Sequence, residues 1–169
     1  MKDKAITIRL IGKVPDQMIE EFFEACVPTI AQQEHYRAKI KNSTIIVGAF
    51  DGDELAGFTC GNRSSPSQVF EGTGIYVKPE YRKKGTWKKA GVGQRLTTRL
   101  IMEARKNGFR EFVGRDLTLE CFRGMQGIAA RMRAKGEKAR PFEMSFGESD
   151  SNHRETIASN FKGMKIKPR

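Results

Sequence analysis

The sequence predicts a single mixed α/β domain. Its 169 residues fall within the usual size of one domain. The spacing of apolar residues changes several times along the chain, between about 3.6 residues, as in an amphipathic helix, and two residues, as in a strand. The expected order is β, α, α, β, β, β, α, β, α, β. Because strands follow one another directly in part of this order, a regularly alternating βαβ series is not expected.

A strand and two helices are expected at the N-terminal end. Residues 5–10 alternate between apolar and polar side chains, and Gly12 closes the strand. A helix then opens at Pro15, which suits the first helical position because an N–H there would have no partner. Its apolar residues recur at helical spacing, namely Met18, Ile19, Phe22, Phe23 and Cys26. Pro28 breaks this helix, and a second one is expected to run to about Ile40.

Three strands are expected next. Residues 44–60 predict a hairpin, because two apolar runs flank the turn sequence Asp51-Gly52-Asp53. Residues 62–67 are polar and predict a loop. A further strand is expected over residues 68–77, and Pro79 follows it.

The second half of the chain predicts two helices and two strands. Residues 91–107 are the best helical segment, and Gly108 stops it. Its apolar stripe consists of Val92, Leu96, Leu100, Ile101 and Ala104. A strand is expected within residues 109–119, a helix over 125–135 and a strand over 141–146.

Composition excludes several classes of protein. No apolar run approaches the ~20 residues needed to cross a bilayer, and three cysteines are ordinary usage and no disulfide scaffold. The N-terminal residues lead straight into an alternating stretch without a secretory apolar region. We therefore expect a cytoplasmic protein with reduced thiols and no membrane partner.

Positive charge is concentrated in two parts of the chain. The net charge is +11, and residues 78–110 carry 11 basic and 2 acidic side chains. Residues 121–169 carry 11 and 5, whereas residues 1–77 carry 8 and 10. This asymmetry predicts a polyanionic ligand such as nucleic acid, an anionic surface or a phosphate-bearing cofactor. The alternative is that the charges form an ordinary solvated surface.

The segment between the strand at 68–77 and the helix at 91–107 has the features of a phosphate site. It is basic and contains glycine, and it leads into the positive end of a helix, where backbone N–H groups can bind an anion. Neither of the two commonest phosphate loops fits. A P-loop needs Gly-Lys-Ser/Thr before the helix, and a dinucleotide loop needs G-x-G-x-x-G with an acidic residue downstream.

Two motifs in this segment carry a family resemblance. Val77-x-Pro79-x-Tyr81-Arg82-x-x-Gly85, followed by Gly91-Val92-Gly93-Gln94-Arg95-Leu96, resembles the acetyl-CoA motif of the GCN5-related N-acetyltransferases (GNAT superfamily). The resemblance covers about residues 5–146. It implies one GNAT-like domain over 1–149, with a mostly antiparallel sheet of six to seven strands splayed at the cofactor strand and about four helices. Residues 150–169 would be a basic C-terminal strand or extension.

The resemblance also implies an acetyl-CoA site made of two segments and no metal. The backbone of Ile75, Tyr76 and Val77 would pair with the pantetheine arm and hold the thioester carbonyl. The turn at Gly91, Val92 and Gly93 would hold the pyrophosphate. Further implied cofactor-binding residues are Arg82, Lys83, Lys84, Gly85, Lys88, Lys89 and Gln94.

The sequence departs from the family pattern in two places. In the family, the motif R/Q-x-x-G-x-G/A is usually continuous. Here the pair Gly91 and Gly93 begins six residues after Gly85. Either the loop is enlarged, or residues 88–93 form the motif with lysine first. Trp87 in this loop would lie on the adenine, on a partner or over the sheet edge. The second departure concerns the tyrosine that donates a proton in many family members. Its position corresponds to Met132 or Arg133 in this sequence, and Glu137 replaces the usual phenylalanine.

Three side chains are the candidates for acid–base chemistry. Glu71, on the strand that would flank the thioester, is the candidate base that deprotonates the ammonium; its alternative is a solvated edge carboxylate. Cys121 and Tyr76 are secondary candidates for the proton donor. Cys121 is otherwise a buried thiol, and Tyr76 alternates away from Glu71. His35 and His153 are expected to be structural.

Two function hypotheses follow. The first is an acetyl-CoA-dependent N-acetyltransferase in which an amine attacks the thioester directly; the acceptor is a small molecule, a protein or an aminoacyl-tRNA. The second is a GNAT-fold binding or structural module without catalysis, which would use its basic surface for nucleic acid or a macromolecular assembly. A homodimer is a further possible partner arrangement.

Overall fold

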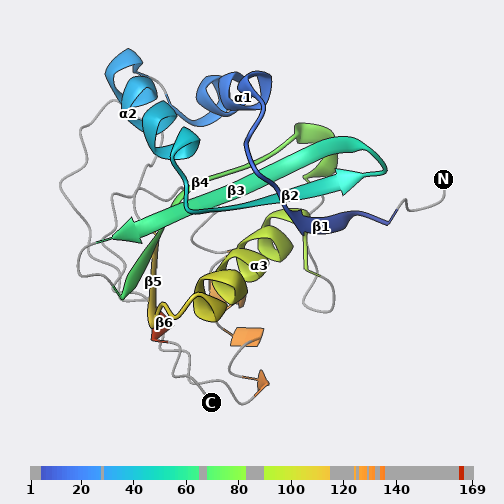
Figure 1. Ribbon diagram of the computed structural model, residues 1–169. Helices are drawn as coiled ribbons and strands as arrows, with labels where there is room; N and C mark the ends of the chain where they lie inside the picture. The colour runs from blue at the N-terminus through green and yellow to red at the C-terminus, as the bar shows by residue number, and fades with distance from the viewer. Residues whose placement is uncertain are drawn as a thin grey trace. The chain divides into compact units, whose positions relative to one another are not determined.

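A computed structural model of the chain describes residues 5–27, 29–64, 68–82 and 90–114, and single positions among 124–135 and 164–165. The first elements are β1 (Thr7–Leu10), α1 (Asp16–Cys26), α2 (Ile30–Lys41), β2 (Ile45–Asp51) and β3 (Glu54–Ser64). They are followed by β4 (Val69–Val77), the short 3₁₀ turn η1 (Pro79–Tyr81), α3 (Val92–Lys106), β5 (Glu111–Gly114) and β6 (Met164–Lys165). This order, traced in Figure 1, confirms the mixed α/β class.

The described strands form one sheet in the order β1-β2-β3-β4-β5-β6. The pairs β1–β2, β2–β3 and β5–β6 are antiparallel, and β4 and β5 are parallel. The sheet is therefore mixed and mostly antiparallel, as expected. The register of β4 with β5 ends at Gly72 and Gly114. The expected splay of β4 involves residues outside the described part of the chain, so it stays a prediction.

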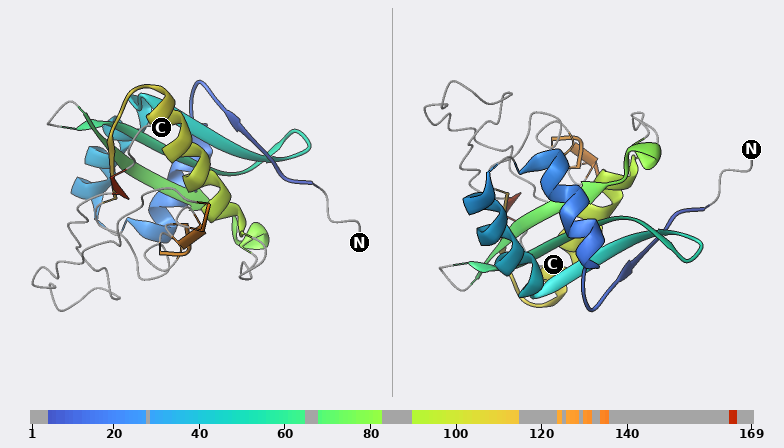
Figure 2. Two further views of the ribbon diagram at one scale, coloured as in Figure 1. Left: turned by 90° about the horizontal axis from the view of Figure 1, so that it is seen from below. Right: turned by 90° about the horizontal axis from the view of Figure 1, so that it is seen from above.

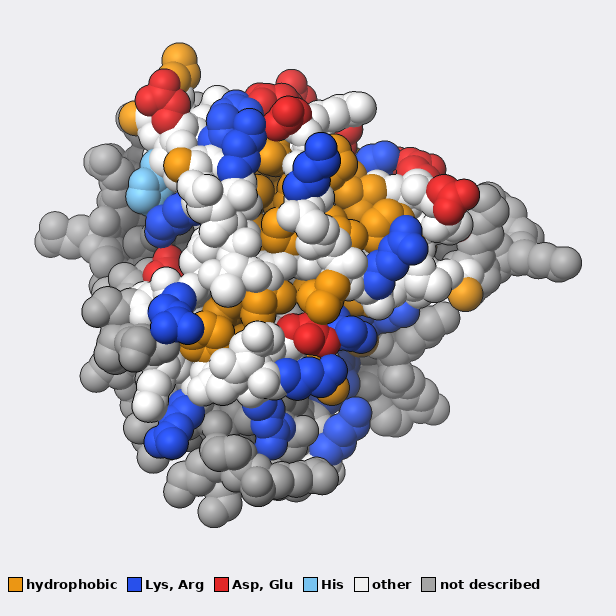
Figure 3. Space-filling model, viewed as in Figure 1, with side chains coloured by type: hydrophobic (Ala, Val, Ile, Leu, Met, Phe, Trp, Pro, Cys, Tyr) orange, Lys and Arg blue, Asp and Glu red, His pale blue; other side chains and the backbone are white. Residues whose placement is uncertain are grey.

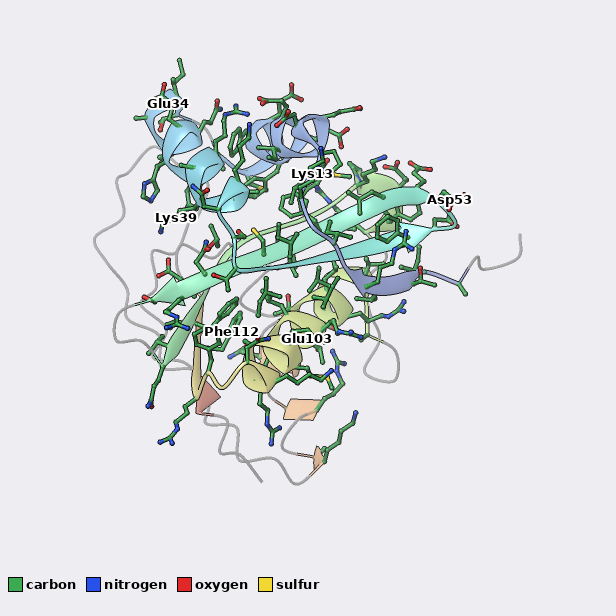
Figure 4. The ribbon with its side chains drawn as sticks, in the orientation of Figure 1. Lys13, Glu34, Lys39, Asp53, Glu103 and Phe112 are labelled. Carbon is green, nitrogen blue, oxygen red and sulfur yellow. The ribbon has the colours of Figure 1, made fainter. Side chains whose placement is uncertain are left out.

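Two compact units make up the chain: Met1–Asn62 with Thr73–Leu100, and Arg63–Gly72 with Ile101–Arg169. In the first unit, the β2–β3 hairpin turns at Gly52 with φ +61°, a left-handed conformation that glycine adopts without strain. The predicted hairpin is thus confirmed. Asp53 projects from its tip (Figure 4). Within this unit, α1 and α2 cover one face of the sheet, and the first part of α3 lies on the other (Figure 2).

An aromatic and aliphatic core joins α1 and α2 to the sheet of the first unit. The ring of Phe22 lies 6.0 Å from that of Phe58 on β3 and 6.5 Å from that of Tyr36 on α2, measured between centroids. The buried members of this core are Val14, Met18, Ile19, Phe22, Phe23, Val27, Ile40, Ile46, Phe58, Cys60 and Tyr76. The helical periodicity of α1 is therefore confirmed, except that Cys26 is exposed.

The helix starts differ slightly from the prediction. Pro15 is the residue before α1 and not its first helical residue. The α2 helix starts after Thr29, whose hydroxyl accepts a hydrogen bond from the backbone N–H of Gln32 at 3.3 Å. This is an N-cap, which satisfies one of the N–H groups that a helix start leaves unpaired. Pro28, the expected break between the helices, lies outside the described residues.

The loop predicted for residues 62–67 is wrong at its first three positions, which continue β3 to Ser64. Asn62 is polar because its side chain connects three segments. Its Nδ2 donates to the carbonyl of Lys39 on α2 (Figure 4) and to Oγ1 of Thr73, both at 3.1 Å. Its Oδ1 accepts from the backbone N–H of Thr44 at 3.1 Å. A polar residue in a strand is stable when its hydrogen bonds are satisfied in this way.

In the second unit, the start of β4 pairs with β5 around an aromatic cluster. Phe70 has its ring centroid 5.1 Å from that of Phe109 and 6.0 Å from that of Phe112, which Figure 4 labels. The α3 helix ends as predicted at Gly108, where φ is +84°. Most of the stripe predicted for α3 is buried: Leu96, Leu100, Ile101 and Ala104. Glu103, on the same helix, is also buried and pairs with Lys106 at 3.2 Å.

The described part of β5 covers residues 111–114 of the strand predicted within 109–119. The described positions between 124 and 134 are helical, in agreement with the predicted helix over 125–135. The strand expected over 141–146 lies outside the described residues. Of the C-terminal twenty residues, the structure describes Met164–Lys165, which form β6 and pair with β5; the two alternatives for this segment stay predictions.

Candidate active site

The end of β4 and the start of α3 lie against each other in the first unit. A Cβ atom placed on Gly93 would lie 3.7 Å from Cδ1 of Ile75 and 3.9 Å from Cγ2 of Val77. These are ordinary van der Waals distances, so the first turn of the helix packs directly on two side chains of the strand. The two segments predicted to hold one cofactor are thus neighbours in space.

Alternation along β4 gives its two faces different neighbours. Ile75 and Val77 face the start of α3, whereas a Cβ on Gly74 would lie 3.6 Å from the ring of Phe22 on α1. Tyr76 belongs to the buried core under α1 and α2 and is 6% exposed. The backbone of β4 between Ile75 and Val77 therefore lies between the start of α3 on one side and α1 on the other.

The start of α3 has the geometry of an anion site. The first backbone hydrogen bond of this helix runs from the N–H of Arg95 to the carbonyl of Gly91 at 3.1 Å. The N–H groups of Val92 and Gly93 precede it, so they have no acceptor within the helix. Their direction and the helix dipole favour a negatively charged group. Gly91, Val92, Gly93 and Gln94 are half-buried.

The strand end is held by contacts on both sides. The backbone N–H of Lys78 donates to the carbonyl of Ala56 at 2.9 Å. A Cβ on Gly57 would lie 2.6 Å from the carbonyl oxygen of Tyr76, closer than any side chain tolerates, so β3 approaches β4 here as only glycine allows. Nε of Arg82 donates to the carbonyl of Val77 at 2.6 Å. Arg82 therefore contacts the end of β4 directly.

Tyr76 lies between a carboxylate and a guanidinium. Burial raises the pKa of its hydroxyl, and the negative charge of the nearby Glu21 carboxylate raises the pKa further. The guanidinium of Arg82, 5.3 Å from the ring centroid, opposes this effect. The hydroxyl is consequently protonated at neutral pH. Sequence analysis did not find Glu21, because one carboxylate on an acidic helix carries no local signal.

The α1 helix that carries Glu21 is acidic. It has four carboxylates and no Lys or Arg: Asp16, Glu20, Glu21 and Glu24. In Figure 3, acidic side chains gather over α1 and over the turn between β2 and β3. The front half of the sequence thus concentrates its negative charge on the helix next to the end of β4.

Glu71, the candidate base, lies on the part of β4 that belongs to the second unit. Its side chain is half-buried, and the hydroxyl of Ser64 donates to its Oε2 at 3.4 Å. Val113 is its partner residue in the register with β5. A hydroxyl donor orients a carboxylate without neutralising it.

Several predicted residues lie outside the described part of the chain. They are Cys121, Lys83, Lys84, Gly85, Trp87, Lys88 and Lys89, together with Met132, Arg133, Glu137 and His153. His35 is exposed and packs edge-on against Tyr36, with 5.7 Å between ring centroids. In the described residues, no group of His, Cys, Asp and Glu side chains is arranged to hold a metal ion.

Comparison with known proteins identifies the family. Residues 15–119 match the model of the acetyltransferase (GNAT) family. The chain belongs to the GNAT family. Its match spans the described β4 and α3, so the family assignment includes both segments of the candidate site. No curated protein sequence matches this GNAT chain.

Solved structures show the same fold. A Bacillus subtilis acetyltransferase in complex with CoA has a TM-score of 0.60 at 19% identity, covering 95% of this chain and 97% of that one. A GNAT acetyltransferase from Elizabethkingia anophelis with acetyl-CoA bound has a TM-score of 0.56 at 14% identity, with 96% and 97% covered. The diaminobutyrate acetyltransferase of Paenibacillus lautus, bound to its substrate and CoA, has a TM-score of 0.63 at 10% identity and 96% coverage of each chain.

None of the helices in the described residues is long and apolar enough to cross a membrane.

Proposed function

We propose that this GNAT protein is an acetyl-CoA-dependent N-acetyltransferase whose acceptor is an amine. The packing of Gly93 on Ile75 and Val77 carries the proposal, because it brings an anion-binding helix start to the end of a strand. Similar chains are solved with CoA or acetyl-CoA bound, which supports the same cofactor here.

The residues present fit the cofactor. The N–H groups of Val92 and Gly93 would take the pyrophosphate. The backbone of Ile75, Tyr76 and Val77 would pair with the pantetheine arm. Arg82, Gly91 and Gln94 complete the described part of the proposed site. Lys83, Lys84, Gly85, Lys88 and Lys89 would add charge and backbone donors from the adjoining loop.

The reaction joins the acceptor nitrogen to the acetyl carbon. Bound acetyl-CoA supplies the thioester, the C–S bond breaks and the thiolate leaves with the bonding electrons. Glu71 would accept the proton of the acceptor ammonium, directly or through a water molecule, so that a neutral amine attacks. Tyr76, which is protonated at neutral pH, and Cys121 are the candidate donors to the thiolate.

Titration calorimetry with acetyl-CoA and with CoA, at low and moderate salt, tests the cofactor site. Saturable binding that persists at moderate salt is expected, because helix N–H groups and close packing contribute to it besides long-range charge. An absence of binding would refute the enzyme proposal. Binding to nucleic acid that weakens steeply with salt would then favour the non-catalytic module.

Acetyl transfer by Glu71→Gln tests the base. We expect a loss of about 10²–10⁴-fold in turnover with CoA binding retained, the usual contribution of a general base. Glu80→Gln, an exposed carboxylate on η1, is the matched control and should keep its activity. Unchanged turnover in Glu71→Gln would remove this residue from the mechanism.

A further inference from the structure

Thr59 is a buried polar residue on β3 that contacts the strand of the candidate site. Its side chain is 3% exposed, and its Oγ1 donates to the carbonyl oxygen of Gly74 on β4 at 2.9 Å. Its register partner on β2, Val47, is fully buried, so the hydroxyl lies in apolar surroundings. A buried hydroxyl costs free energy unless it is hydrogen-bonded, and Gly74 supplies the acceptor here.

Valine would fill this position without that requirement. Like threonine it is β-branched and favours strands, but it has no polar group to satisfy. The neighbours along β3, Phe58 and Cys60, belong to the core with α1 and α2, so Thr59 points to the opposite face of the sheet. On that face, Ile75 and Val77 pack against the start of α3. Threonine therefore places a hydrogen-bond donor on the face that the proposed cofactor site uses.

The backbone groups of β4 alternate in direction along the site. Three of them turn toward β3: the carbonyls of Gly74 and Tyr76 and the N–H of Lys78. Since these directions alternate along a strand, the backbone N–H and carbonyl groups of Ile75 and Val77 point away from β3. Ile75 and Val77 therefore present their backbone groups on the other side of the strand, where a ligand can pair with them.

One rigid peptide group connects Thr59 to Ile75. The carbonyl of Gly74 and the N–H of Ile75 belong to the same planar group, and in a trans peptide they point in opposite directions. A hydroxyl that holds the carbonyl also fixes the direction of the N–H. The Thr59 hydroxyl thus orients the N–H of Ile75 away from β3.

The N–H of Ile75 suits the acetyl end of the cofactor. Arg82, which donates to the carbonyl of Val77 at 2.6 Å, leads into the basic loop, so the phosphates are expected beyond this end of β4. The thioester of an extended acetyl-CoA lies far from its phosphates, which places it toward Ile75. As an amine attacks, negative charge develops on the thioester oxygen, and an oriented N–H donor stabilises that charge.

We propose that Thr59 is a positioning residue for acetyl transfer: its hydroxyl holds the Gly74 carbonyl so that the Ile75 N–H donates to the thioester oxygen of acetyl-CoA. The inference rests on the proposed acetyltransferase function and adds to it a residue of β3, outside the acetyl-CoA motif. Thr59 does not touch the reacting atoms itself. Its effect depends on the acetyl group, because CoA has no carbonyl at this position.

Infrared spectroscopy of bound acetyl-CoA, isotope-labelled at the thioester carbonyl, tests the contact. A hydrogen bond to the oxygen lowers the stretching frequency of a carbonyl. The frequency should therefore rise in Thr59→Val, which lacks the hydroxyl, and stay at the unmodified value in Thr59→Ser, which retains it. The control Ser43→Ala removes a hydroxyl that donates to the carbonyl of Lys39 at 3.0 Å, beside the end of α2, and should also leave the frequency unchanged. An unchanged frequency in Thr59→Val, or an equal rise in Thr59→Ser, would overturn the proposal.

Calorimetry of CoA and acetyl-CoA binding gives a second readout. The ratio of the Kd for CoA to the Kd for acetyl-CoA should fall about two- to tenfold in Thr59→Val, the usual contribution of one hydrogen bond. Thr59→Ser and Ser43→Ala should keep the ratio of the unmodified protein. A purely structural role of Thr59 would weaken both ligands alike, so an unchanged ratio in Thr59→Val would contradict the proposal.

The outcomes separate this inference from the proposed function. Acetyl-CoA binding with the same carbonyl frequency in all variants would leave the acetyltransferase proposal in place and reject the role of Thr59. An absence of acetyl-CoA binding to the unmodified protein would reject both.

Discussion

Replacing Gly57 by alanine should displace the end of β4. The new Cβ would lie 2.6 Å from the carbonyl oxygen of Tyr76 and 3.0 Å from Cα of Val77. Both neighbours are backbone atoms, so no side-chain rotation can relieve the overlap and the strand must move. Overpacking of this kind costs about 1–3 kcal/mol.

The neighbouring hydrogen bond should weaken as well. The N–H of Lys78 donates to the carbonyl of Ala56, the residue before Gly57, and its loss adds about 1 kcal/mol. The free energy of unfolding should therefore fall by about 3 kcal/mol, which lowers the Tm of a chain of this length by about 6–12 °C. Because the backbone of Tyr76 and Val77 is proposed to hold the cofactor, CoA affinity should fall at least tenfold.

Thermal unfolding and CoA calorimetry measure the two effects. The matched control is Gly74→Ala, the same change on β4 itself, where the new Cβ meets the ring of Phe22 at an ordinary 3.6 Å. This variant should keep its CoA affinity and its Tm, or gain up to about 1 kcal/mol from a less flexible unfolded chain. If Gly57→Ala matched Gly74→Ala in both measurements, the close approach of β3 and β4 would be refuted.

Three further predictions concern stability and the strand end. Burial raises the pKa of the Cys60 thiol from 9.0 to about 11. Because the folded state holds this proton more tightly than the unfolded state does, the contribution is complete below pH 9 and is lost as the pH rises through 11. The free energy of unfolding should fall there by about 3 kcal/mol more than in Cys60→Ala, as urea titrations across this range would measure; parallel pH profiles would contradict it. Arg82→Ala removes the hydrogen bond to Val77 and should cost about 1 kcal/mol and weaken CoA binding, whereas an unaltered CoA isotherm would exclude Arg82 from the site. Asn62→Ala removes three hydrogen bonds, but the Thr44 N–H keeps the Gly61 carbonyl and the Lys39 carbonyl keeps the Ser43 hydroxyl. Stability should therefore fall by about 1–3 kcal/mol with CoA binding retained, and an unchanged Tm would argue against the network.

The elements that sequence analysis predicted well are those fixed by nearby residues. The β2–β3 hairpin follows from Asp51-Gly52-Asp53, since Gly52 supplies the positive φ of the turn. The end of α3 follows from Gly108 for the same reason. The amphipathic patterns of α1 and α3 predicted most of their buried residues, because residues three or four positions apart lie on the same face of a helix.

Sequence analysis was wrong, or made no prediction, where contacts between residues distant in the sequence determine the structure. Polar residues after position 61 predicted a loop, but Asn62 stays in β3 because Lys39, Thr44 and Thr73, all distant in sequence, satisfy its side chain. Cys26 fitted the helical stripe and is nevertheless exposed at the end of α1.

The sequence by itself determined the fold class, the GNAT motif and the two segments proposed to bind acetyl-CoA, because motifs and periodicity are local properties of the chain. Only the tertiary structure decided that Gly93 packs on Ile75 and Val77 and that Gly57 must be small. These contacts join residues far apart in the sequence. They depend on strand order and on the packing of helices against the sheet, which no local pattern specifies.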